Sequence, residues 1–413
     1  MTPRQRVLAA LNHQQPDKVP IDFSAHRSSG ISAIAYAKLR RYLKLPELPI
    51  RVYDMIQQLA IVDPDVLDRF GVDTIEMGRG FLTDDRDWKD WTLPDGTPCQ
   101  IPLYVNVRRD GPHWLICSDS GIPLGVQKKG CLYFEQIHFP RMDRPFAEDD
   151  FADLESTLGL TQWSVAHPGA HLPLNANGLA EMARCAKRLR ESTDRAIVGL
   201  FGGNMFEMPQ MLYRMDNYLM YMGLYPEATL RLSEALCKIY LAKLEKWLAA
   251  VGPYIDVILF GDDLGCQTGP LLSPEMYRRY YKPYHARMWK RAKQLAAVKV
   301  MLHCCGGIYE LLDDLIDAGL DTFNPVQISC TRMDAGTLKS RFGDRIAFWG
   351  GGCDTQTILP EATPDQIARH VRKQVGILNP GGGFIFQQVH NIQADVPPPN
   401  VVAMFDAIRS NTQ

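Results

Sequence analysis

The sequence of 413 residues lacks any long apolar run and any marked excess of one charge. No stretch approaches the roughly 20 apolar residues that cross a bilayer, and the polar opening MTPRQRVLAALNHQQPDKVP lacks the apolar core of a signal peptide. With 45 Lys and Arg against 47 Asp and Glu, the formal net charge is -2, which argues against a polyanionic partner. We therefore expect a cytoplasmic protein with no membrane or nucleic-acid partner.

The ten cysteines lack a regular spacing, and a chain of this length does not need disulfides for stability. Repeats, low-complexity tracts and linkers are also lacking, which predicts a single domain over residues 1–413. Cys185 and Cys237 lie in amphipathic helical segments, where a thiol is expected to be a small core residue. Four other cysteines cluster late in the chain and need another explanation: Cys304, Cys305, Cys330 and Cys353.

Short runs rich in β-branched and aromatic residues alternate with helical stretches. Eight such runs are predicted to be strands: 19–23, 72–77, 196–202, 256–262, 298–304, 322–327, 346–351 and 384–389. Helix starts are readable at Ser273-Pro274 and at Thr363-Pro364, where Gln366 completes a capping box. The alternation predicts an α/β fold with parallel strands, and eight units predict a (β/α)8 TIM barrel. A doubly wound open sheet competes, but no G-x-G-x-x-G follows the first strand.

One stretch, residues 84–145, breaks the alternation. The turn dipeptides Asp95-Gly96 and Asp110-Gly111 are flanked by alternating residues, which is typical of β-hairpins. We interpret this stretch as an antiparallel insertion after the second strand, lying over the barrel mouth as part of a lid.

Polar residues gather where the predicted strands end, and active sites of barrels lie at the carboxyl ends of the strands. We predict substrate-binding roles for His26, Arg27, Asn204, Glu207, Asp263, Asn324 and Gln327. Asp262 and His390 are the predicted catalytic residues, as proton donors or substrate anchors. The alternatives are that Asp262 and Asp263 cap the following loop, and that His390 belongs to a structured turn.

His303 and Cys305 form the most specific pair in the sequence. On an extended backbone residues i and i+2 point to the same side, and an imidazole beside a thiolate suits zinc. Cys353 is the preferred third ligand because glycines precede it and let the backbone come close, and Cys330 is the second choice. The alternative is that His303 and the cysteines simply pack in the core.

Several segments together resemble the uroporphyrinogen decarboxylase superfamily, over nearly the whole chain. They are TPRQRVLAALNHQQPDKVPIDF, GDDLG with SPEMYRRYYKPYH, HCCG, NPVQ, WGGGCDTQ and GGGFIFQQVHNIQADVPP. The resemblance implies a barrel and one of two chemistries. Decarboxylases of the family carry an arginine-rich R-Q-A-G-R-Y segment that grips the substrate's carboxylates, and this sequence has DFSAHRSSGI there. The other branch comprises zinc-dependent corrinoid methyltransferases, in which an H-x-C pair and a later cysteine hold the metal.

His303 and Cys305 match that pair, whereas the later cysteine of the coenzyme M methyltransferases falls where this chain has 381–383, all glycine. The resemblance therefore implies demethylation of a small methylated substrate such as an aryl methyl ether. Zinc would stabilise the leaving group and a corrinoid (cobalamin) would accept the methyl group. No D-x-H-x-x-G motif occurs, so we expect the corrinoid on a separate partner protein, and a homodimer remains compatible with the sequence. The alternatives are decarboxylation of a polycarboxylate and a non-catalytic barrel that binds a small ligand.

Overall fold

A parallel seven-stranded sheet forms the centre of the fold in the computed structural model, which describes residues 1–165, 169 and 171–409. The strand order is β17-β16-β15-β14-β11-β10-β3. The strands are β3 (Thr74–Glu76), β10 (Ala196–Gly202), β11 (Val257–Gly261), β14 (Lys299–His303), β15 (Thr322–Asn324), β16 (Ala347–Trp349) and β17 (Phe384–Ile385). Each lies within a predicted run, so the expectation of an α/β, TIM-barrel-like fold is confirmed.

The two edges of this sheet meet at the segment predicted to be the first strand. Ile21 bridges Phe386 in parallel, and the Asp73 amide donates to the Ile21 carbonyl at 2.8 Å. The prediction of a full strand over 19–23 is wrong, since this contact is a single bridge. Pro20 has no amide hydrogen, and the Ile21 amide donates to the Asp73 side chain at 2.9 Å, so the ladder does not continue. The sheet therefore curls and closes through one short contact.

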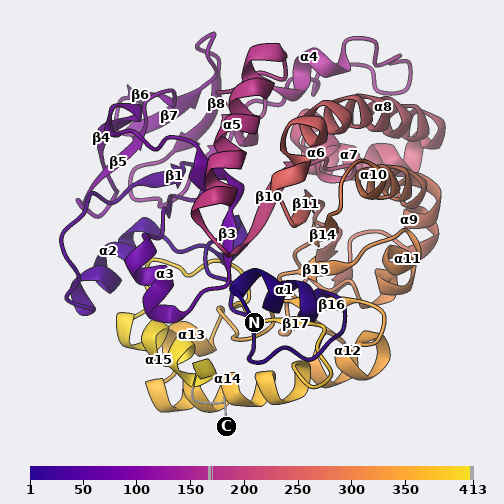
Figure 1. Ribbon diagram of the computed structural model, residues 1–413. Coiled ribbons are helices and arrows are strands. Elements are labelled where there is room, and N and C mark those ends of the chain that lie inside the picture. The colour runs from indigo at the N-terminus through magenta and orange to yellow at the C-terminus, as the bar shows by residue number, and fades with distance from the viewer. Residues whose placement is uncertain (166–168, 170, 410–413) are drawn as a thin grey trace.

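Helices surround the sheet (Figure 1). In chain order they begin with α1 (Pro3–Leu11), α2 (Ala33–Tyr42), α3 (Pro64–Phe70), α4 (Leu154–Leu158), α5 (Ala176–Ser192), α6 (Glu207–Tyr213) and α7 (Met215–Leu224). They continue with α8 (Pro226–Val251), α9 (Pro274–Tyr280), α10 (Lys282–Leu295), α11 (Leu312–Asp317), α12 (Ala335–Phe342), α13 (Ile358–Glu361), α14 (Pro364–Leu378) and α15 (Pro398–Arg409). Among the described helices, none is long and apolar enough to cross a membrane.

Helix α14 shows why these segments fold as they do. Thr363 caps its first turn and Gln366 completes the predicted capping box. Ile367, Val371 and Val375 recur at helical spacing and are buried, so one face of the helix packs against the core. The predicted N-cap at Ser273 is also present, since its side chain accepts from the Met276 amide at 3.2 Å.

Helix α1 covers the amino end of the sheet. Its Val7, Ala10 and Leu11 belong to one buried cluster with strand residues such as Val198 and Met301. Apolar side chains therefore fill this end of the sheet, whereas active sites of such barrels lie at the opposite end, where the strands finish.

The insertion consists of antiparallel strands at the upper left of Figure 1, as predicted. A hairpin of β4 (Trp88–Thr92) and β5 (Pro98–Pro102) is followed by a four-stranded sheet. That sheet comprises β6 (Asn106–Asp110), β7 (His113–Cys117), β8 (Pro123–Gln127) and β9 (Glu135–Gln136). Gly96 and Gly111 have positive φ angles, which the two predicted turns require. A short hairpin of β1 (Val52–Asp54) and β2 (Leu59–Ala60) lies beside it.

Candidate metal and active site

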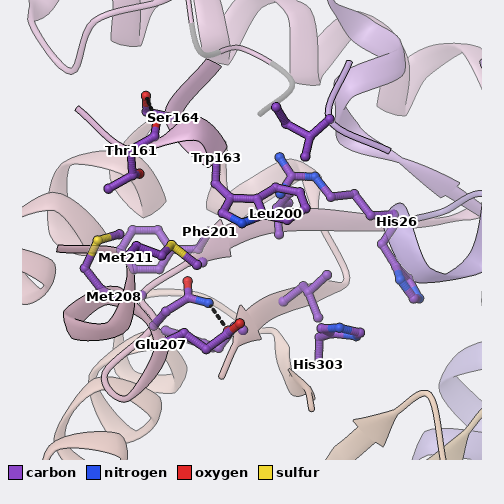
Figure 2. A pocket seen from close by; sticks show the side chains of 18 of the residues that line it. His26, Thr161, Trp163, Ser164, Leu200, Phe201, Glu207, Met208, Met211 and His303 are labelled. Atoms are coloured by element: carbon purple, nitrogen blue, oxygen red, sulfur yellow. Dashed lines mark hydrogen bonds between the residues drawn. The ribbon is translucent and has the colours of Figure 1, made fainter. Parts of the chain in front are cut away.

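A cavity of about 720 Å³ lies at the carboxyl ends of the strands. Its walls come from the ends of β10, β11 and β14, from the loop after β17, from helices α5, α6 and α8, and from the insertion residues Tyr133 and Phe134. In the view of Figure 2, His26 and His303 lie on one side of the cavity and Met208 and Met211 on the other. The size suits a small organic molecule.

Three potential metal ligands meet at one side of this cavity. The side-chain ligand atoms of His303, Cys305 and His390 all lie within 4.8 Å of one another. His303 Nε2 is 3.4 Å from Cys305 Sγ, close to the separation of about 3.5 Å that tetrahedral zinc bonds of 2.0–2.3 Å would give. Within the part of the chain that the structure describes, no other group of three His, Cys, Asp or Glu side chains meets this condition.

Asn324 fixes the orientation of the His303 ring. Its Nδ2 donates to the Trp349 carbonyl at 2.9 Å and to Gln387 Oε1 at 2.6 Å, so its Oδ1 must face His303. That oxygen can only accept, and therefore His303 Nδ1–H donates to it at 2.9 Å. The proton is thus held on Nδ1, and the Nε2 lone pair points toward Cys305, as in histidines that bind metals.

The protonation of these groups also fits a metal. Burial lowers the pKa of His303, and burial together with the neighbouring His303 lowers the pKa of His390 to about 4. Both imidazoles are therefore neutral at neutral pH and have a free lone pair. Burial and the nearby Asp263 carboxylate raise the pKa of Cys305, so a thiolate there needs a cation beside it. Two nitrogens and one sulfur are a donor set that suits zinc.

The loop that follows β17 presents His390, whose φ angle of 62° lies in the left-handed region. Two contacts hold the neighbouring residues. Asn391 Nδ2 donates to Gln57 Oε1 at 2.6 Å, and the Tyr133 hydroxyl donates to Gln393 Oε1. The β1–β2 turn and the insertion therefore fasten the loop that carries the third candidate ligand.

The prediction that Cys353 is the third ligand does not agree with this geometry. Cys353 bridges Gln388 through its backbone and is fully buried in the hydrophobic core, with Sγ 3.7 Å from the Asp354 carbonyl. Cys330, the second choice, is also a core residue. Both side chains pack among apolar groups, and burial raises the pKa of Cys330 to about 11. His390, which was predicted to be catalytic, is instead the third candidate ligand by its position.

Asp262 was predicted to be catalytic, but its carboxylate is fully used inside the fold. It accepts from the backbone amides of Met205, Phe206 and Glu207 at 2.8–3.2 Å, and His285 Nε2 lies 3.1 Å from it. The side chain is fully buried and does not line the cavity. Asp262 therefore caps the first turn of α6 from a neighbouring strand.

The adjacent Asp263 does line the cavity, together with Asn204 and Glu207. Asn204 Nδ2 donates to Glu207 Oε2 at 2.6 Å. Asp263 Oδ1 accepts from the Cys305 amide at 2.7 Å and lies 3.7 Å from His303 Nε2. The structure thus brings these three predicted residues to the same cavity as the candidate metal ligands His303 and His390.

Two further predicted residues, His26 and Arg27, line the same cavity. His26 Nε2 pairs with Asp22 at 3.1 Å, and Arg27 Nε pairs with Asp54 at 3.0 Å. The Arg27 guanidinium also lies over the Trp163 ring, 5.1 Å from its centroid. Both side chains are therefore held in place by buried carboxylates.

Two residues predicted to bind substrate have supporting roles instead. Asn324 is fully buried and orients His303. Gln327 lies outside the cavity lining and accepts from the Gly306 amide at 2.9 Å, which fixes the turn after β14.

The apolar wall of the cavity was missed at the level of the sequence. Trp163, Leu200, Phe201, Met208 and Met211 line it. Met208 and Met211 share one face of α6 because they are three residues apart, and this spacing was a readable signal. Trp163 lies in a single 3-10 turn (Gln162–Val165), which is too short to show periodicity, so the sequence offered no signal for it.

Comparison with known proteins identifies the family of this chain. The profile of the family described as Uroporphyrinogen decarboxylase (URO-D) matches residues 146–411. The chain belongs to the uroporphyrinogen decarboxylase (URO-D) family. The uroporphyrinogen decarboxylase of Psychromonas ingrahamii is 27% identical over 143 residues, which are 34% of this chain and 38% of that protein. That of Dechloromonas aromatica is 21% identical over 322 residues, 76% of this chain and 83% of that protein.

A structural comparison gives the same fold. A methyltransferase from Methanosarcina mazei superposes with a TM-score of 0.59 at 15% sequence identity, covering 99% of each chain. The chain spans about two fifths of the length of the first curated relatives that it matches. Family and fold follow from these likenesses, and the resemblance read from the sequence motifs is confirmed at that level.

Proposed function

We propose that this protein is a zinc-dependent methyltransferase that moves a methyl group from a small apolar methylated compound, such as an aryl methyl ether, to a corrinoid on a partner protein. The observation that carries the proposal is the meeting of His303, Cys305 and His390 at the edge of a cavity with an extensive apolar wall. An apolar wall favours an aromatic or aliphatic substrate, and the donor set favours a metal at its reacting end.

In this proposal, separate groups of residues bind the metal, orient a ligand and hold the substrate. His303, Cys305 and His390 would hold zinc, which as a Lewis acid stabilises negative charge on the leaving atom of the substrate. Asn324 keeps the His303 lone pair available. Trp163, Phe201 and Met208 would exclude water from the substrate and hold its apolar part.

Decarboxylation of a porphyrinogen is the second candidate, because curated relatives carry that name. A polycarboxylate needs several unpaired cations around it. Among the described residues that line the cavity, the Lys and Arg side chains are Arg27 and Lys243, and each already pairs with a carboxylate, Asp54 at 3.0 Å and Glu155 at 3.5 Å. This charge distribution favours methyl transfer.

A single experiment separates the two candidates. The purified protein, loaded with zinc, is mixed with chemically reduced cobalamin and a panel of aryl methyl ethers, methylthiols and methylamines. We expect methylcobalamin to form, followed by its visible absorbance, with at least one ether. Release of carbon dioxide from uroporphyrinogen without any methyl transfer would establish the second candidate. Binding of an ether with neither reaction would leave a ligand-binding barrel.

A further inference from the structure

Glu207 is an acidic side chain of the cavity that the candidate metal site does not use. It is the first residue of α6, it lines the cavity, and Figure 2 shows its side chain in the cavity, hydrogen-bonded to its neighbour. That neighbour is Asn204, whose Nδ2 donates to Glu207 Oε2 at 2.6 Å.

The end of strand β11 leaves room for this pair. A Cβ atom added at Gly261 would lie 2.8 Å from Asn204 Nδ2, which is closer than real Cβ contacts. The glycine therefore allows Asn204 to sit against the strand and to bond one oxygen of Glu207. The backbone amide of Asp263 is a second hydrogen-bond partner of the Glu207 carboxyl group, so the side chain is fixed at the cavity wall.

The other acidic groups near the metal ligands are engaged. Asp262 accepts three backbone amides and faces His285. Asp263 accepts from the Cys305 amide and lies beside His303. Burial, with the charges of Asp263 and Asp262 close by, raises the pKa of Glu207 well above its ordinary value, which favours the protonated form of this carboxyl group.

We propose that Glu207 is a catalytic residue that donates its proton to the leaving atom of the methylated substrate. This inference rests on methyl transfer as the proposed function. The carbon–oxygen bond of the ether breaks and its electron pair stays on the oxygen, which takes the proton of Glu207 and leaves as a neutral phenol. The methyl group is taken by the electron pair of the reduced corrinoid. Glu207, left as a carboxylate, recovers its proton from water.

The test compares two ethers whose leaving groups differ in basicity. Glu207→Gln keeps the bond from Asn204 but has no acidic proton. With zinc-loaded protein and reduced cobalamin, E207Q should transfer the methyl group of anisole, whose phenol has a pKa near 10, about 10²–10⁴-fold more slowly in kcat than wild type. The methyl group of 4-nitroanisole should be transferred within about threefold of the wild-type rate, because the nitrophenolate needs little help from an acid.

Gln210→Ala is the matched control, since Gln210 lies on α6, bonds the Phe206 carbonyl at 3.0 Å and does not line the cavity. It should behave as wild type with both ethers. An equal loss with both ethers in E207Q would assign Glu207 a merely structural role and overturn the proposal. A wild-type protein that transfers no methyl group from any compound of the panel overturns the proposed function, and this role with it.

A spectroscopic measurement tests the same group without turnover. The infrared difference spectrum of wild type minus E207Q at neutral pH should contain the carbonyl stretch of a protonated carboxyl group. If the spectrum contains only carboxylate bands, Glu207 holds no proton to donate and the proposal is wrong. Zinc content should be the same in the two proteins, so that a changed rate reports on proton transfer.

Discussion

At the scale of single residues, the direction in which one lone pair points decides whether the site can bind metal. Asn324 has its own amide fixed by the Trp349 carbonyl and Gln387, and it therefore holds the Nδ1 proton of His303. The partner of an asparagine oxygen must donate, so the other ring nitrogen is left free to accept a metal. A buried side chain outside the cavity thus determines the chemistry inside it.

The first prediction concerns the ligands themselves. Wild-type protein should bind about one zinc ion per chain, and His303→Ala, Cys305→Ser and His390→Ala should each lose most of it, since three protein ligands form a catalytic zinc site. Elemental analysis after dialysis is the measurement. Cys353→Ala is the control and should keep its zinc, because this thiol lies in the core. Loss of zinc in C353A alone would restore the ligand set predicted from sequence.

The second prediction concerns Glu76, which is 2% exposed and has an unpartnered Oε1 among the described residues. Burial raises its pKa to about 7 from the ordinary glutamate value of 4.5. Between these two values the folded state binds more protons than the unfolded state, so stability falls as pH rises. From pH 5 to pH 8 wild type should lose about 2–3 kcal/mol of stability relative to Glu76→Gln, measured by urea unfolding at both pH values. A constant difference between the two proteins would contradict this.

At the scale of elements, helix α6 is bonded to the end of a central strand and also forms part of the cavity wall. The backbone amides at the start of this helix have no acceptor within the helix, and the carboxylate of Asp262, just after β11, accepts their hydrogen bonds. The same helix then places Glu207, Met208 and Met211 on the cavity wall. From the sequence, Asp262 and Asp263 were correctly expected at the carboxyl end of a strand. The local backbone decides that Asp263 faces the cavity and Asp262 faces the helix.

The third prediction tests this capping role. Asp262→Ala leaves three buried amides and His285 without their acceptor, so it should destabilise the protein by about 2–4 kcal/mol in urea unfolding. Asp216→Ala is the matched control. Asp216 lies in the first turn of α7, and its pair with Arg214 is exposed to solvent, so the substitution should leave the urea midpoint essentially unchanged. A D262A protein of wild-type stability would show that solvent replaces the carboxylate.

At the scale of the whole molecule, periodicity and strand order could be predicted from the sequence, whereas side-chain partners could not. The runs at 298–304 and 322–327 alternate with helices, so parallel strands and the i, i+2 pair of His303 and Cys305 followed directly. The choice between Cys353 and His390 depended on a left-handed residue in the loop after β17 and on its contacts with Gln57. Such contacts join segments more than 300 residues apart, and no local pattern encodes them.

The fourth prediction follows from the separation between the core and the cavity. The buried cluster under α1 and the helices around the sheet hold the fold together without any of the candidate ligands. Removal of zinc with a chelator should therefore leave a folded protein with an unchanged circular dichroism spectrum. Free zinc at 100 times its dissociation constant adds only about 2.7 kcal/mol to the stability of the fold. Thermal unfolding of the metal-free protein should therefore remain cooperative, at a modestly lower temperature.

Methyl transfer to reduced cobalamin should fall to background in the metal-free protein and return when zinc is added back, since the leaving atom loses its Lewis acid and then regains it. Magnesium, which prefers oxygen ligands, should not restore it. Unfolding on chelation would mean that the metal is structural. Full activity of the metal-free protein would mean that the site around His303 and Cys305 acts without a metal, and the zinc-dependent function would then be wrong even though the fold stands.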